Sequence, residues 1–194
     1  MAKMSAVEKF FVNRKNRSLH EILADLDGTL AISNVSKVLE VGAGAGKLSL
    51  LLNEKYHPAS LHITDVDEEQ INLAEKNVKE RYSSVPTNLR LEKADLLDLR
   101  YSEESFDVVF AIMVFHHVGG KNLDAALDNA SSVLKVGGQL VYSEMFHKRK
   151  IKDYLTRNGF TISYSKSHAL GLGELVVATK SLRNPDGECR VETV

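Results

Sequence analysis

The sequence is poor in cysteine and has neither a long apolar run nor an excess of charge of one sign. Cys189 is the single cysteine among 194 residues, which excludes an internal disulfide and any zinc site built from several cysteines. No apolar run approaches the roughly 20 residues of a membrane helix, and residues 1–5 lack the apolar core of a signal peptide. The formal net charge is −1, whereas general nucleic-acid binders usually carry a basic excess. We therefore expect a cytoplasmic protein with no membrane partner, and a nucleic-acid partner is not favoured.

Strand-like and helix-like patterns alternate after residue 36. The expected strands cover residues 35–41, 60–64, 88–92, 106–113 and 139–143, followed by a hairpin-like pair at 160–164 and 174–179. The expected helices cover residues 48–56, 68–82 and 123–134, the last ended by Gly137-Gly138, with a further helix around 151–155. This alternation predicts an α/β fold, a doubly wound and mainly parallel sheet with helices on both faces.

The two ends of the chain differ from this pattern. Residues 1–35 have the apolar spacing of two short helices and could cover a ligand, so we interpret them as an N-terminal helical lid. Residues 36–182 form the expected α/β domain, and residues 183–194 are polar and indicate a flexible tail.

Three glycines follow the first expected strand at alternate positions, Gly42, Gly44 and Gly46. A strand that ends in such a turn brings bare backbone N–H groups close to a ligand. Glu40 precedes the first glycine by two residues, and a carboxylate there suits a hydroxyl or an ammonium group better than a phosphate. The loop therefore predicts a nucleoside-like ligand without a phosphate chain, although a tight turn with no ligand is the alternative.

Two aspartates lie at the ends of the next two expected strands. Asp65 directly follows the second strand, and a carboxylate there could accept both hydroxyls of a ribose. It could instead cap the next helix, but Asp67 fills that role better. Asp95 follows the third strand and could accept the exocyclic amine of an adenine, or be a solvated loop acid. In an open α/β sheet, ligands bind beyond the carboxyl ends of the strands, where these side chains would meet.

Three known phosphate-related motifs resemble parts of the sequence but do not fit in spacing or in local structure. A dinucleotide fingerprint needs its third glycine at position 47, which is Lys47, and a phosphate-binding P-loop needs four residues between its glycines instead of three. Residues 25–30, Asp-Leu-Asp-Gly-Thr-Leu, match the nucleophile signature of haloacid-dehalogenase-like phosphatases. That chemistry needs the first aspartate at the tip of a buried strand, whereas the residues before it have helical spacing. We expect a turn there.

Five motifs in order give a more specific resemblance. They are Glu40–Gly46, Asp65 with Ile71 and Ala74, Ala94-Asp95-Leu96, Phe106–Val109 leading to Phe115–Val118, and Leu134–Gly138. On these motifs the chain resembles the class I S-adenosylmethionine-dependent methyltransferases. The resemblance implies a seven-stranded sheet whose last strand is antiparallel, S-adenosylmethionine as cofactor, and S-adenosylhomocysteine as product.

The resemblance also implies a set of cofactor-binding residues. Glu40 would lie near the methionine end, Asp65 would hold the ribose, and Asp95 would contact the adenine. The full implied set is Glu40, Gly42, Ala43, Gly44, Gly46, Asp65, Val66, Asp95, Leu96, Ala111 and Ile112.

Two histidines follow the fourth expected strand, where the acceptor should meet the methyl group. Either His116 or His117 could take a proton from a hydroxyl or an amine, or could merely pack near the cofactor. Glu144 and His147 follow the fifth strand and could hold an acceptor or a metal, but a polar loop is the simpler interpretation, and we expect no metal site.

The leading hypothesis is a methyltransferase acting on a small molecule, because the short lid leaves no room for a separate substrate domain. A homodimer could also complete the pocket. Residues 147–150 form a basic run, His-Lys-Arg-Lys, which together with Lys152 could hold an anionic acceptor but is more typical of a solvated helix start. The alternatives are a methyltransferase acting on protein or RNA, and a non-catalytic cofactor-binding module that serves a partner enzyme.

Overall fold

A computed structural model describes residues 19–168 and 173–181. The first part of the expected lid, residues 1–18, and the expected tail, residues 183–194, lie outside the described residues. In the described ranges no helix is both long and apolar enough to cross a membrane.

Within the described residues, seven strands form one sheet in the order β3-β2-β1-β4-β5-β7-β6. The strands are β1 (Lys37–Glu40), β2 (Ser60–Asp65), β3 (Leu89–Lys93), β4 (Phe106–Ile112), β5 (Leu134–Glu144), β6 (Phe160–His168) and β7 (Gly173–Lys180). The pairs among β1 to β5 are parallel, whereas β7 runs antiparallel to both β5 and β6. The predicted seven-stranded sheet with an antiparallel last strand is confirmed.

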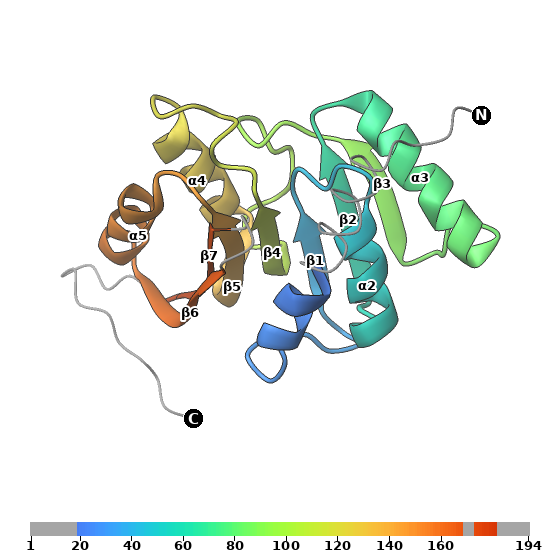
Figure 1. The fold of residues 1–194 in the computed structure, drawn as a ribbon, viewed down its shortest axis with the longest axis horizontal. Coiled ribbons are helices and arrows are strands. Elements are labelled where there is room, and N and C mark those ends of the chain that lie inside the picture. The colour runs from blue at the N-terminus through green and yellow to red at the C-terminus, as the bar shows by residue number, and fades with distance from the viewer. Residues whose placement is uncertain (1–18, 169–172, 182–194) are drawn as a thin grey trace.

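Helices cover both faces of the sheet, as predicted (Figure 1). They are α2 (Lys47–Tyr56), α3 (Glu68–Tyr82), α4 (Leu123–Ser132) and α5 (Lys148–Arg157), preceded by a short helix over residues 19–25. One core cluster joins the sheet to α4 and α5, and a second joins the opposite face to residues 19–26, α2 and α3. The described part of the expected lid therefore packs into the core through Leu19, Ile22 and Leu26. A covering role stays a prediction for residues 1–18.

The boundary between α4 and β5 differs from the prediction. The helix ends at Ser132, and β5 begins at Leu134, so Gly137-Gly138 lies inside the strand and does not end the helix. A Cβ atom on Gly138 would lie 2.9 Å from the backbone oxygen of Asp107. The glycine is needed because two backbones approach closely where the pairing of β4 with β5 is irregular. The glycine pair is thus a strand feature, which the sequence pattern does not separate from a helix end.

The segment that resembles a phosphatase nucleophile motif forms a turn, as expected. Residues 26–29 are in turn conformation, and the Thr29 hydroxyl donates a hydrogen bond to the Leu26 carbonyl at 2.8 Å. Asp25 ends the preceding helix and forms an ion pair with Lys166 of β6 at 2.6 Å. The aspartate therefore ties the N-terminal segment to the far edge of the sheet.

The strand order fixes where a ligand would bind. The strands β2 and β3 lie on one side of β1, whereas β4 and the later strands lie on its other side, so the strand order reverses between β1 and β4. The loops after β1 and β4 therefore separate at the carboxyl edge, which is the point where open α/β sheets bind ligands. The glycine loop and the two histidines lie on these two loops.

Candidate functional site

The glycine loop has the backbone shape that its sequence predicts. Gly42, Gly44 and Gly46 all have positive φ angles, 61°, 55° and 69°, which side-chain-bearing residues rarely adopt. The loop is anchored to β2, since the Ala43 amide donates a hydrogen bond to the Thr64 carbonyl at 2.8 Å. Gly46 is then the first residue of the turn into α2.

Each glycine has a different steric environment. A Cβ atom on Gly42 would lie 2.6 Å from Cγ2 of Val114, in the loop after β4. A Cβ atom on Gly46 would lie 3.0 Å from that of Ala74 in α3, whereas at Gly44 no atom would be nearer than Gln70 Oε1, at 3.7 Å. Gly42 and Gly46 therefore allow close packing, and the open space is at Gly44.

Asp65 ends β2 and binds the glycine loop directly. One carboxylate oxygen accepts a hydrogen bond from the Gly44 amide at 2.8 Å, and the other accepts from the Asp67 amide at 3.0 Å. Asp65 is buried. Helix capping falls to Asp67, whose side chain accepts from the Glu69 amide at 2.9 Å, as the sequence predicts. A carboxylate oxygen has lone pairs for more than one donor, so Asp65 can both hold the loop and accept from a ligand hydroxyl.

Glu40 is buried at the end of β1. Its carboxylate accepts a hydrogen bond from the Ser49 hydroxyl of α2, and its backbone carbonyl accepts from the Thr64 hydroxyl at 2.9 Å. These contacts attach the start of the loop between β1 and α2 to both α2 and β2. Ser49 and Thr64 could not be predicted as part of the site, because single hydroxyl residues in a helix and a strand carry no recognisable motif.

Three residues were expected near the adenine of the cofactor: Val66 and Asp95 are exposed, and Leu96 is buried. Val66 follows Asp65 and is 58% exposed, which leaves an apolar surface beside the carboxylate. Asp95 is exposed, and its side chain accepts a hydrogen bond from the Leu97 amide at 2.9 Å. The side chain of Leu96 is buried in the core.

The side chains of the expected cofactor residues at the end of β4 are largely buried. Ala111 is fully buried in the core cluster under α4 and α5, whereas Ile112 is half-buried. Met113 follows with a φ of 59°, and its amide donates to the Ser143 carbonyl of β5 at 2.8 Å. The strand therefore ends in a sharp turn that carries the next residues across the edge of the sheet.

The two histidines have different surroundings. His116 is half-buried, and its Nδ1 lies 2.9 Å from Oε2 of Glu144. Glu144 is the last residue of β5 and is fully buried. His117 is exposed, and its ring lies 3.9 Å from the His116 ring between centroids. The structure thus brings Glu144 and His116 together but gives His117 no carboxylate partner among the described residues.

Tyr142 lies in β5, two residues before Glu144, so both side chains face the same side of the sheet. Its side chain is 1% exposed and packs edge-on against Phe115. Burial, together with the nearby carboxylates of Glu174 and Glu144, raises the pKa of the Tyr142 hydroxyl well above its usual value. Its hydroxyl has no hydrogen-bond partner in the part of the chain that the structure describes.

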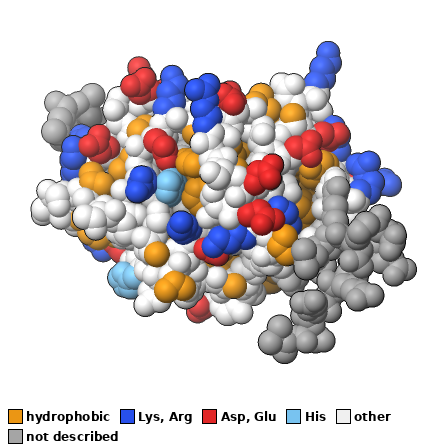
Figure 2. All heavy atoms as spheres, turned by 180° about the vertical axis from the view of Figure 1, so that it is seen from behind, with side chains coloured by type: hydrophobic (Ala, Val, Ile, Leu, Met, Phe, Trp, Pro, Cys, Tyr) orange, Lys and Arg blue, Asp and Glu red, His pale blue; other side chains and the backbone are white. Residues whose placement is uncertain are grey.

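Charged side chains elsewhere are largely paired. In the basic run, Arg149 pairs with Asp153 at 3.7 Å and Lys150 pairs with Asp124 at 3.4 Å. The back view shows basic and acidic side chains interspersed on that face (Figure 2). No group of three or more potential metal ligands occurs among the described residues.

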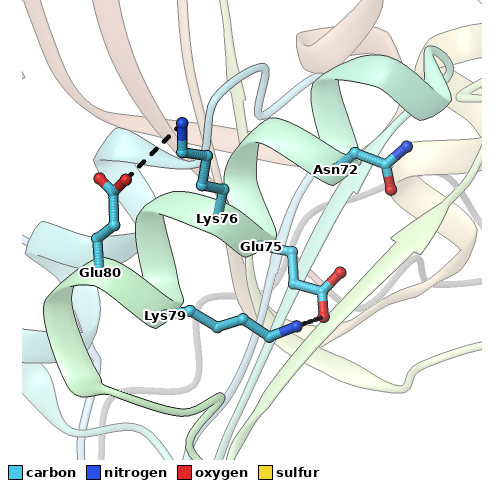
Figure 3. A pocket seen from close by; sticks show the side chains of 5 residues that line it. All are labelled: Asn72, Glu75, Lys76, Lys79 and Glu80. Carbon is cyan, nitrogen blue, oxygen red and sulfur yellow. Dashed lines mark ion pairs between the residues drawn. The ribbon is translucent and has the colours of Figure 1, made fainter.

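A hollow on the outer surface of α3 shows the same pairing (Figure 3). Lys79 pairs with Glu75 at 2.6 Å, and Lys76 pairs with Glu80 at 3.9 Å, each one helical turn away. Because these charges neutralise each other within one helix, the hollow has no excess charge that would attract a ligand.

A family described as "Methyltransferase domain" matches residues 38–138, more than half of the chain. The chain belongs to the class I S-adenosylmethionine-dependent methyltransferase family. The matched residues include the glycine loop, Asp65, Asp95 and both histidines.

Characterised members of this family are distant relatives of the chain. Phosphoethanolamine N-methyltransferase of Plasmodium falciparum is 24% identical over 155 residues, covering 77% of this chain and 54% of that protein. Demethylmenaquinone methyltransferase of Bacteroides fragilis is 28% identical over 143 residues, covering 72% and 54%. The chain therefore spans about half the length of these curated relatives.

Solved methyltransferases share the fold. Magnesium protoporphyrin IX methyltransferase from Synechocystis, crystallised with bound SAM, superposes with a TM-score of 0.73 at 19% identity, covering 93% of this chain and 86% of that chain. A SAM-dependent methyltransferase from Aquifex aeolicus gives a TM-score of 0.66 at 17% identity, covering 83% and 88%.

Proposed function

We propose that the protein transfers the methyl group of S-adenosylmethionine to a small-molecule acceptor and releases S-adenosylhomocysteine. The observation that carries this proposal is the glycine loop held by Asp65 at the edge where the strand order reverses. The glycine loop and Asp65 both lie within residues 38–138, the part of the chain that matches the methyltransferase family.

The residues present fit this cofactor chemically. Asp65 has acceptor capacity for the ribose hydroxyls, and Asp95 offers a carboxylate for the adenine amine. Exposed Val66 supplies apolar surface for the adenine ring, and the open space at Gly44 lets the ligand approach the backbone. The carboxylate of Asp65 against the loop would repel a phosphate, which supports a cofactor that carries a sulfonium and an ammonium group instead.

Glu40 would act at the methionine end through the loop it supports, since its side chain is buried and bound by Ser49. Gly42, Ala43 and Gly46 would shape the loop. Leu96, Ala111 and Ile112 would contribute chiefly backbone, since the first two side chains are buried.

A small acceptor is supported by the methyltransferases named above, which act on phosphoethanolamine, demethylmenaquinone and magnesium protoporphyrin. Ion pairs within the basic run weigh against RNA, because two of its cations, Arg149 and Lys150, already have acidic partners. A homodimer that completes the acceptor pocket, and a cover formed by residues 1–18, remain part of this proposal.

Calorimetric titration with S-adenosylmethionine tests the cofactor site. Losing hydrogen bonds to a charged group costs about 1.5–3 kcal/mol, so Asp65→Ala should weaken binding about 10- to 100-fold. Asp67→Ala is the matched control, because it removes the neighbouring carboxylate, which caps α3, and should leave affinity within about 2-fold. Absence of binding to the wild type, or equal affinity of Asp65→Ala, would contradict the cofactor site.

A labelled-methyl screen against a cell extract tests the acceptor. Label should enter the small-molecule fraction. Label in RNA or protein that disappears when Lys148, Arg149 and Lys150 are replaced by glutamine would favour the macromolecular alternative. Cofactor binding without transfer to any fraction would favour a non-catalytic module.

A further inference from the structure

The pair formed by Glu144 and His116 is more specific than either residue alone. The two residues are 28 positions apart: His116 lies in the loop after β4, and Glu144 is the last residue of β5. His116 presents two groups to the same carboxylate: its backbone amide lies 3.3 Å from Oε1 and its Nδ1 lies 2.9 Å from Oε2. A ring held at both its backbone and its side chain has one orientation.

The burial of Glu144 makes this contact electrostatically important. Its side chain is fully buried, and a buried carboxylate is strongly disfavoured unless it is paired. Among the described residues, His116 is the one ion-pair partner of Glu144. The backbone at Glu144 is packed closely against β7, because a Cβ atom on Gly173 would lie 2.0 Å from the Glu144 carbonyl oxygen.

The contact determines which ring nitrogen of His116 carries hydrogen. An ionised carboxylate only accepts hydrogen bonds, so Nδ1 must donate to it. In the neutral imidazole Nε2 then has the free lone pair, and it is the nitrogen that can take a proton. His117, without such a carboxylate among the described residues, has no equivalent constraint.

Exposed apolar side chains lie next to this pair. Met145 and Phe146 follow Glu144 directly and are 40% and 55% exposed. The Phe146 ring centroid lies 5.9 Å from that of His116. A base beside exposed aromatic and thioether groups suits an acceptor whose reacting group is attached to an apolar skeleton.

On these grounds we propose that Glu144 is a positioning residue that holds His116 as the general base, and that the acceptor is a hydroxyl on an apolar or aromatic skeleton. This inference rests on the proposed methyltransferase function. A hydroxyl keeps its proton at neutral pH and so needs a base when it attacks, whereas a neutral amine can attack first and lose its proton afterwards.

The step balances in atoms and charge. Nε2 of His116 takes the hydroxyl proton while an oxygen lone pair forms the bond to the methyl carbon. The bond between that carbon and sulfur breaks, and its electron pair stays on sulfur as a thioether. One positive charge leaves the sulfonium and one appears on the imidazolium, beside the buried carboxylate that stabilises it.

Nitrogen-15 NMR of the full-length labelled protein tests the pair without any acceptor. Neutral His116 should be protonated at Nδ1. In Glu144→Gln the amide can donate to Nδ1 instead, so the ring should change to the Nε2-protonated form. His117→Gln is the matched control and should leave the His116 tautomer unchanged. A wild-type His116 protonated at Nε2, or an unchanged tautomer in Glu144→Gln, would overturn the positioning role.

The methyl-label screen tests the acceptor class. Mass spectrometry of the labelled products should find methyl groups on oxygen, and Glu144→Gln and His116→Asn should each lower kcat about 10²- to 10⁴-fold with unchanged cofactor affinity. Label on nitrogen or carbon overturns the hydroxyl assignment. Absence of cofactor binding refutes the proposed function itself, and calorimetry detects that outcome separately from the NMR result.

Discussion

Replacing Gly42 with alanine should be distinctly more harmful than the same change at Gly44. Both residues have positive φ, which costs an alanine about 1–2 kcal/mol. At Gly42 the new methyl group would also lie 2.6 Å from Cγ2 of Val114, well inside the roughly 3.5–4.0 Å of a favourable carbon–carbon contact. Val114 is buried and its β-branched side chain has few rotamers, so overpacking should add about 1–3 kcal/mol.

The expected losses of unfolding free energy are therefore about 2–5 kcal/mol for Gly42→Ala and about 1–2 kcal/mol for Gly44→Ala. Urea denaturation followed by circular dichroism measures both. With a slope of about 2 kcal/mol per molar urea, the two midpoints should differ by about 0.5–1.5 M. The difference isolates the steric effect, because the backbone penalty is common to both variants.

A double-mutant cycle with Val114→Ala identifies the contact responsible. Removing both valine methyl carbons clears the space, so Gly42→Ala should be better tolerated in that background, with a coupling energy of about 1–3 kcal/mol. Strictly additive losses, or equal midpoints for the two glycine variants, would refute the idea that the loops after β1 and β4 are packed against each other at Gly42.

Further outcomes concern hydroxyls, caps and pH. Tyr142→Phe should keep or slightly raise thermal stability, since the buried hydroxyl has no partner among the described residues, whereas Tyr154→Phe should lose about 1 kcal/mol with its hydrogen bond to Asp128; a larger loss at Tyr142 would contradict this. Asp67→Ala should cost about 1 kcal/mol in urea by removing the α3 cap, and an unchanged midpoint would argue against capping. Burial alone would raise the pKa of Glu174, but hydrogen bonds from Lys152 and Ser165 outweigh it, so the pKa lies below its usual value. The unfolded state then binds the proton more readily, so the stability advantage over Glu174→Gln is present above about pH 4.5 and is lost as pH falls through the lower folded-state pKa; an advantage that persists in acid would show that the charge is not responsible.

The architecture was predictable because its signals are local. Apolar runs and helical patterns place most of the described strands and helices within a few residues, although β5 begins five residues before its expected start, and the glycine spacing with Glu40 identifies the loop. The end of α4 was placed wrongly, because the apolar spacing continues through Val133 and Leu134 as the chain passes from helix to strand. A helical stripe and the start of a buried strand look alike when both are short and apolar.

A residue of the candidate site could be predicted only where its type and its position in the sequence indicate a role by themselves. Asp65 and Asp95 could be chosen by their positions after strands, and Asp67 could be assigned as a cap because acidic residues follow it. The pair of Glu144 and His116 could not be found in this way, because 28 residues separate them and their meeting depends on the register of β4 with β5. Contacts across a sheet carry no signature in either segment alone.

The hydrogen bond between Asp65 and the Gly44 amide has a consequence for turnover. Under the proposed function, this carboxylate and its loop hold the nucleoside half of the ligand, which is chemically the same before and after the methyl group leaves. Contacts at the nucleoside end cannot distinguish the methyl donor from its demethylated product. The product therefore competes with the donor for the same site. Sustained activity then depends on a reaction elsewhere that removes the demethylated thioether.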